Sequence, residues 1–144
     1  MSTAKYTGEC LCGGVRFTVL NEPKAVLSCH CEHCRKGAGG IGQVFGVFSK
    51  DDDLNLKPGS EDNISTYVFT KTTSGKPKDK TFCKSCGVPL WTVTDDVRQK
   101  GQIILRTALL DKGSELKPKA AIFTTGRPSW AGSMEGVPDF ETMP

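Results

Sequence analysis

Three short runs hold all seven cysteines of this 144-residue chain: Cys10-Leu11-Cys12, Cys29-His30-Cys31-Glu32-His33-Cys34 and Cys83-Lys84-Ser85-Cys86. A structural zinc site has four thiolate or imidazole ligands in a tetrahedron, whereas a catalytic zinc site has three protein ligands and one open position. Seven ligands therefore divide into a closed set of four and an open set of three. The cysteine count predicts two zinc ions per chain, one of them accessible to a substrate.

Disulfide bonds and an iron–sulfur cluster are the alternatives to zinc. An odd number of cysteines leaves one thiol unpaired, and partners two or three residues apart are poorly placed to bridge each other. An iron–sulfur cluster held by four cysteines would leave three of the seven cysteines without a role. Zinc accounts for all seven residues. Because free thiolate ligands fit a reducing compartment, we also expect a cytoplasmic protein.

Length and composition predict a single domain over residues 1–144, with 37% apolar and 24% charged residues, as is ordinary for a globular protein. The longest apolar runs, 103–105 and 120–123, are far too short to cross a bilayer, and we expect no membrane contact. The formal charge of +3 is scattered along the chain. Since nucleic-acid binding usually needs a concentrated basic face, we expect no nucleic-acid partner.

The fold is predicted to be mainly β with little helix, because short apolar runs with strand-forming residues alternate with Gly and Pro. Strands are expected at residues 15–19, 43–49, 64–70, 90–94, 102–109 and 121–125. The one short helix is expected at 30–36, ended by Gly37 and the pair Gly39-Gly40.

The remaining long segments are predicted to lack regular structure. Residues 51–63 and 71–80 are polar and are interpreted as surface loops, the second with four solvated lysines. Residues 129–144 are interpreted as an irregular closing tail, held against the body by its apolar side chains.

The first and third cysteine clusters each have the form of a zinc knuckle, a tight turn that offers two thiolates and is followed by glycine. Cys10 and Cys12 supply one half of a tetrahedron, and Cys83 and Cys86 supply the other half. The two halves lie about seventy residues apart, and a shared metal would therefore close a long loop and contribute to folding.

The middle cluster then stands alone. Cys31 and Cys34 are three residues apart and share one side of a short helix, while Cys29 comes from the strand before it. A histidine, His30 or His33, would close this site if it were the fourth ligand. Spacing leaves that alternative open, as it does a partition that joins the first knuckle to two of the middle cysteines.

Charged residues around the middle cluster are candidates for work on a substrate. Arg35 and Lys36 are the nearest cations and could hold a carboxylate, but they also fit a solvated helix end that the dipole favours. Glu32 and His33 are candidates for proton transfer. A surface role is favoured for Glu32 and His33, because most exposed polar residues take no part in catalysis.

With these motifs the chain resembles the glutathione-dependent formaldehyde-activating enzyme family, whose domain is also called CENP-V/GFA. The likeness covers nearly the whole length, and three cysteine motifs in this order are specific. Its matching segments are Gly8-Glu9-Cys10-Leu11-Cys12-Gly13-Gly14-Val15-Arg16-Phe17, residues 29–36, Phe82-Cys83-Lys84-Ser85-Cys86-Gly87, Arg127-Pro128-Ser129-Trp130 and Gly136-Val137-Pro138-Asp139-Phe140.

The resemblance implies a single-domain, Mss4-like, zinc-bound β fold. It implies a structural zinc on Cys10, Cys12, Cys83 and Cys86. It implies a catalytic zinc on Cys29, Cys31 and Cys34. The implied activity is that of a zinc-dependent carbon–sulfur lyase on a glutathione or other thiol adduct of a small aldehyde, as in the joining of formaldehyde and glutathione to S-hydroxymethylglutathione. The implied partner is a small-molecule substrate such as glutathione.

Two other functions stay open. A zinc lyase, isomerase or dehydratase of a different small metabolite would use the same open site, whereas a non-catalytic zinc binding module would close it with a protein side chain. The resemblance is also incomplete at Ala120-Ala121-Ile122-Phe123, where many relatives carry a histidine. The fourth ligand of the middle cluster distinguishes an enzyme from a module.

Overall fold

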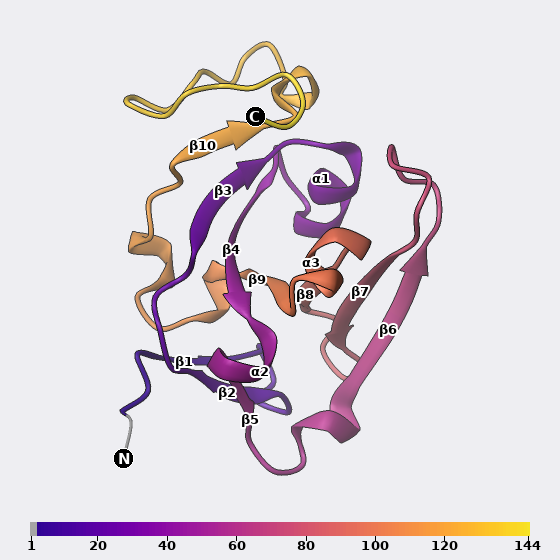
Figure 1. Ribbon diagram of the computed structural model, residues 1–144, viewed down its shortest axis with the longest axis vertical. Helices are drawn as coiled ribbons and strands as arrows, with labels where there is room; N and C mark the ends of the chain where they lie inside the picture. The colour runs from indigo at the N-terminus through magenta and orange to yellow at the C-terminus, as the bar shows by residue number, and fades with distance from the viewer. Residues whose placement is uncertain (1–2) are drawn as a thin grey trace.

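The computed structural model describes residues 3–144 and shows one mainly β domain built from two sheets, as predicted (Figure 1). The smaller sheet has the order β1-β2-β5 and consists of β1 (Tyr6–Glu9), β2 (Arg16–Val19) and β5 (Leu54–Leu56). All its pairs are antiparallel.

The larger sheet has the order β10-β3-β4-β9-β8-β7-β6. Its strands are β3 (Ala25–Cys29), β4 (Gln43–Ser49), β6 (Ile64–Phe69), β7 (Lys78–Cys83), β8 (Pro89–Val93), β9 (Gln102–Arg106) and β10 (Ala120–Ile122). β10 is parallel to β3, and the other neighbours are antiparallel. The six predicted strands are all present, but the last two are shorter than expected because 3-10 helices follow closely at Thr107–Leu109 and Thr124–Gly126.

The α-helices are short: α1 (Glu32–Ala38), α2 (Lys50–Asp53) and α3 (Asp95–Gln99). Cys31 is the N-cap of α1, and the helix ends at Gly39, which has a φ of 77° and so takes a left-handed conformation that favours glycine. The prediction that Gly37 ends this helix was wrong, since Gly37 lies within it. No helix of residues 3–144 has the length and apolarity needed to cross a bilayer.

The two predicted loops were partly wrong, because tertiary contacts organise their polar residues. Residues 51–63 include β5, most of α2 and a 3-10 helix, Ser60–Asn63. There the buried Asp53 carboxylate accepts hydrogen bonds from the Asn21 amide (2.6 Å) and the Ser49 N–H (2.8 Å). In the segment 71–80, the last three residues already belong to β7.

The main core lies between the two sheets. It consists of Cys10, Val15, Phe17, Val19, Phe48, Cys83, Leu90, Trp91, Ile103, Leu105 and Leu110. Within it, Phe17 of the small sheet meets Trp91 of the large sheet edge-on, with ring centroids 6.3 Å apart. The first and third cysteine clusters are thus anchored in this core by Cys10 and Cys83, while Cys12 is exposed.

The opposite face of the large sheet carries a second, smaller cluster. Directly paired residues of neighbouring strands point to the same face, and the register therefore places on this face Cys29, Gln43, Phe45, Arg106, Ile104, Thr92, Lys80 and Lys78. Figure 1 shows α1 seated here, between the β3–β4 pair and the β6–β7 hairpin. Its Cys34 packs against Cys29, Phe45 and Ile122.

The tail, residues 129–144, runs along the outer edge of β10 (Figure 1). The Phe140 N–H donates to the Ala121 carbonyl (2.8 Å), and the Ala121 N–H donates to the Pro138 carbonyl (2.9 Å). Val137 is buried, but Trp130 is exposed. The tail is therefore held by backbone hydrogen bonds and by some of its apolar side chains only.

Candidate metal centres

The first and third cysteine clusters form two turns of the same design. The N–H of the first cysteine donates to the carbonyl five residues later, at 3.1 Å from Cys10 and 2.9 Å from Cys83. Each turn passes through a glycine with positive φ, 76° at Gly13 and 77° at Gly87. This conformation is strained for other residues, which explains why glycine follows both cysteine pairs.

These turns bring the sulfur atoms of Cys10, Cys12, Cys83 and Cys86 within 4.8 Å of one another. The Cys12 sulfur lies 3.6 Å from that of Cys10 and 3.7 Å from that of Cys83. The corners of a zinc tetrahedron with 2.3 Å bonds are about 3.8 Å apart. A disulfide needs about 2.05 Å, and an iron–sulfur cluster would separate its thiolates by several atoms. The geometry fits a single ion.

Backbone donors support the same interpretation. Three N–H groups donate to these sulfurs, from Gly14 to Cys12 at 3.4 Å, from Val15 to Cys10 at 3.3 Å and from Cys86 to Cys83 at 3.5 Å. Hydrogen bonds of this kind orient metal-binding thiolates and stabilise their charge. The four residues therefore fit a metal such as zinc in both geometry and chemistry.

The middle cluster forms a second group, in which the sulfurs of Cys29, Cys31 and Cys34 also lie within 4.8 Å of one another. Cys29 ends β3, Cys31 caps α1, and Cys34 follows one turn later. The Cys34 N–H donates to the Cys31 sulfur (3.4 Å). Hydrogen bonds from the neighbouring thiols of Cys29 and Cys34 lower the pKa of Cys31, and the hydrogen bond with Cys31 raises the pKa of Cys29. The group therefore holds negative charge close together, which a metal cation would stabilise.

His30 does not complete this group. Its Nδ1 lies 2.8 Å from the Ile41 carbonyl and must donate to it, which leaves Nε2 to accept from the Ser28 hydroxyl at 3.3 Å. The ring is buried and both nitrogens are engaged. His30 therefore holds the segment between Cys29 and Cys31 in place.

His33 lies beside the group but also stays outside it. Its ring stacks on Phe69 with centroids 4.8 Å apart, and its Nδ1 accepts from the Lys78 ammonium at 3.0 Å. Burial first, and then the charge of Lys78, lower the pKa of His33 to about 4. Within the described chain, each group of potential metal ligands contains cysteines alone.

Of the charged residues next to the cysteines, none that the sequence singled out reaches the thiols as a free cation or acid. The Lys36 ammonium pairs with the Glu32 carboxylate on the exposed side of α1, at 2.7 Å. The Arg35 Nε donates to the His30 carbonyl at 3.0 Å. The first two are at the surface, and Arg35 supports the backbone of the cluster.

Three other cations surround the cysteine triad instead: Lys78, Lys80 and Arg106, all half-buried. None of them forms an ion pair within residues 3–144. Burial and the charge of Arg106 lower the pKa of Lys80, and burial lowers that of Arg106. The interpretation of residues 71–80 as a solvated loop concealed two of these cations. The strand-forming residues Thr81 and Phe82, which run straight into a knuckle, were the signal for a strand.

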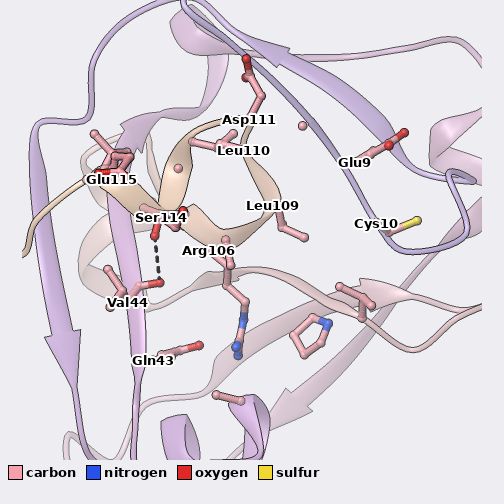
Figure 2. Close-up of a pocket in the computed structure, with 18 of the residues that line it drawn as sticks. Glu9, Cys10, Gln43, Val44, Arg106, Leu109, Leu110, Asp111, Ser114 and Glu115 are labelled. Atoms are coloured by element: carbon pink, nitrogen blue, oxygen red, sulfur yellow. Dashed lines mark hydrogen bonds between the residues drawn. The ribbon is translucent and has the colours of Figure 1, made fainter.

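Gln43 links the triad to an open groove. Its Nε2 donates to the Cys34 sulfur at 2.8 Å, while its buried Oε1 has no partner in the described residues. The groove has a volume of about 1300 Å³, and Gly37, Gly42, Gln43 and Arg106 are among the residues that line it. Figure 2 shows the Arg106 side chain extending toward Gln43 and away from Glu115. A small molecule in the groove would therefore meet the face that carries the triad.

Two β sheets that meet at a four-cysteine group, with three further cysteines at a short helix, define a mainly β domain of the Mss4-like type in which each cysteine group could hold a metal ion such as zinc. The chain belongs to the family described as glutathione-dependent formaldehyde-activating enzyme, whose model matches residues 5–126. That match covers all seven cysteines.

A curated relative supports this placement. It is a protein of Schizosaccharomyces pombe named as an uncharacterized lyase, and it is 28% identical over 87 residues, which are 60% of this chain and 56% of the relative. The match thus spans little more than half the length of that relative.

Proposed function

We propose that the protein is a zinc-dependent carbon–sulfur lyase that makes or breaks the thiol adduct of a small aldehyde, with formaldehyde and glutathione as the first pair to test. The closed site would hold a structural zinc on Cys10, Cys12, Cys83 and Cys86. The open site would hold a catalytic zinc on Cys29, Cys31 and Cys34. Membership of the family and the name of the relative support a lyase.

The observation that carries the proposal is the composition of the second group. Three thiols converge there without a histidine: both nitrogens of His30 are hydrogen-bonded, and the His33 ring stacks on Phe69 with its Nδ1 bonded to Lys78 and its buried Nε2 without a partner in the described residues. Three protein ligands are the pattern of a catalytic zinc site, because the fourth position stays free for a substrate. A zinc ion bound there would act as a Lewis acid and favour the deprotonated form of a substrate thiol.

The residues of the chain would perform the remaining tasks. Cys29, Cys31 and Cys34 hold the metal, and the Gln43 amide orients the Cys34 sulfur through its hydrogen bond. Lys80 and Arg106 supply positive charge on the same face of the sheet, which favours a thiolate over a thiol and stabilises negative charge that develops on an aldehyde oxygen. In the part of the chain that the structure describes, neither cation is paired with a carboxylate that would neutralise it.

The test is a comparison of two variants, Cys31→Ser and Ser85→Ala. The first removes a thiolate from the open site and should abolish turnover of formaldehyde with glutathione while the structural zinc stays bound. The second changes an exposed residue of the other knuckle and should keep both metals. Full turnover by a Cys31→Ser protein that elemental analysis shows to lack its second zinc would contradict the proposal.

A lyase, isomerase or dehydratase of another small metabolite is the second candidate. It is favoured by the departure at β10, where Ile122 lies directly opposite Cys29 and is buried. Position 122 therefore places an aliphatic side chain against the triad, in a segment where many relatives carry a histidine. Inactivity of the intact, zinc-replete protein on glutathione adducts would favour this candidate.

A further inference from the structure

We infer that Lys80 and Arg106 form a binding site for a carboxylate of the substrate, next to the cysteine triad. The inference deepens the proposed function and rests on it, because it specifies the class of thiol that the open site takes. That class is an acidic thiol, in which a carboxylate lies a few bonds from the sulfur.

The geometry at Gly37 carries the inference. A methyl group built on Gly37 would lie 2.9 Å from the Arg106 Nη2 and 3.0 Å from the Lys80 Nζ. Two cationic groups therefore converge on one point beside α1, and they are less than about 6 Å apart. Two unit charges at such a separation repel each other by a few kcal/mol at the effective dielectric of a partly buried site. An anion between them would remove this repulsion.

No protein group supplies that anion. Within residues 3–144, neither Lys80 nor Arg106 makes an ion pair or a side-chain hydrogen bond to a carboxylate. Lys76, four residues before Lys80, is paired with Asp95 at 3.1 Å. The other arginine of the β8–β9 region, Arg98, is likewise paired, with Asp79. Lys78, Lys80 and Arg106 are thus the cations of strands β7 to β9, and within the described residues all three lie without an ion pair on the face that carries the triad.

The triad itself accounts for only part of the positive charge. A zinc ion with three thiolates has a net charge of about −1. Lys78, Lys80 and Arg106 together contribute three positive charges, which leaves a surplus of about two. Lys78 is oriented by its hydrogen bond to His33, whereas Lys80 and Arg106 are the pair that faces Gly37. This surplus fits an anionic ligand that enters together with the substrate thiol.

A carboxylate matches the donors. The guanidinium of Arg106 offers a planar fork that pairs with both oxygens of a carboxylate, and the ammonium of Lys80 adds a third charge-assisted hydrogen bond. Arg106 also lines the groove, where its side chain extends toward Gln43 (Figure 2). A ligand that reaches this point from the groove would have its thiol near Cys34.

The experiment measures binding, not turnover. Zinc-replete protein is titrated by calorimetry with 3-mercaptopropionate and with 3-mercaptopropionamide, which differ in charge but hardly in shape. We expect the acid to bind at least about tenfold more tightly, because a charge-assisted hydrogen bond contributes roughly 1.5–3 kcal/mol. Equal affinities, including no measurable binding of either compound, would overturn the inference.

Three variants test whether Lys80 and Arg106 cause the preference for the acid over the amide. Lys80→Gln and Arg106→Gln should each reduce the preference for the acid about tenfold, while the matched control Lys76→Gln should keep it. Gly37→Ala changes no charge and improves the helix propensity of α1, but its methyl group would displace both cations. It should therefore reduce the preference as well, in a protein that still folds.

The outcomes separate the two levels of the proposal. A preference for the acid that persists in both Lys80→Gln and Gly37→Ala would overturn the carboxylate site. A preference that the variants remove would support that site even if the intact protein failed to turn over any aldehyde adduct. In that case the proposed lyase function would be wrong, but the assignment of an acidic thiol as the ligand would still hold.

Discussion

Replacement of Cys83 by serine should destabilise the domain more than replacement of Cys31. Both changes remove one thiolate from a proposed zinc site, but the sites join very different parts of the chain. The Cys12 and Cys83 sulfurs lie 3.7 Å apart although the residues are separated by 71 positions. The middle group spans only the short segment from Cys29 to Cys34.

The magnitude follows from the entropy of loop closure. If a metal cross-link restricts the unfolded chain as a disulfide does, a loop of about 70 residues corresponds to about 4.4 kcal/mol, and a loop of about six residues to about 2 kcal/mol. The difference of about 2 kcal/mol corresponds to a difference in melting temperature of about 4–8 °C for a domain of this size. Cys83 is also fully buried in the main core, and a serine hydroxyl there would add to its loss.

The assay is thermal unfolding of zinc-replete protein followed by circular dichroism, with metal content measured for each variant. Ser85→Ala, in the same turn, is the control for a change of sequence without loss of a ligand. Cys83→Ser should melt several degrees below Cys31→Ser, although each variant should lose one of its two zinc ions. Equal losses of melting temperature in the two variants, or a larger loss in Cys31→Ser, would refute the division into a structural and an open site.

Three further results are expected. Elemental analysis should find two zinc ions per chain, and a chelator should remove the ion of the open site first, since three protein ligands hold it instead of four; a single ion would contradict this. Gly126→Ala should disturb the middle cluster and lower the zinc content at that site, because its methyl group would clash with the His30 carbonyl oxygen, whereas Gly132→Ala has open space and should leave the zinc content unchanged. Asp139→Asn should lower the melting temperature at pH 7 by an amount that corresponds to at most about 1 kcal/mol, because the carboxylate accepts hydrogen bonds from Arg127, which lower its pKa. Because the pKa of Asp139 is lower in the folded state, its ionised carboxylate stabilises the fold fully above the unfolded pKa near 4, and this stabilisation is lost as the pH falls through the folded pKa. The melting temperatures of the two proteins should therefore converge below about pH 4.

The sequence was most informative where a feature is local. The two knuckles were predictable because each consists of two cysteines and a glycine whose left-handed conformation closes the turn. The strand at 43–49 was predictable because its apolar residues form one continuous run between turn residues. These patterns involve residues that are close in sequence, and the local structure they predict does not depend on distant contacts.

The sequence was least informative where partners are distant. Asp53 reads as one of three loop aspartates, and only the contacts with Asn21 and Ser49 explain why it is buried. Lys78 and Lys80 read as part of a solvated loop because lysines are usually exposed. Their position on a strand facing α1 depends on the pairing of β7 with β6 and β8, which no local pattern reveals.

The pairing of β7 also connects the two centres. One end of this strand carries Lys78 and Lys80 on the face of the open site, and its last residue, Cys83, begins the second knuckle. Because successive residues of a strand point to opposite faces, this strand presents Lys78 and Lys80 to the small cluster and Thr81 and Cys83 to the main core. A metal on the four-cysteine site would therefore do more than stabilise the fold, since it would fix one end of the strand whose other end presents the two lysines. The four-cysteine site and the proposed carboxylate site would in this way be parts of one arrangement.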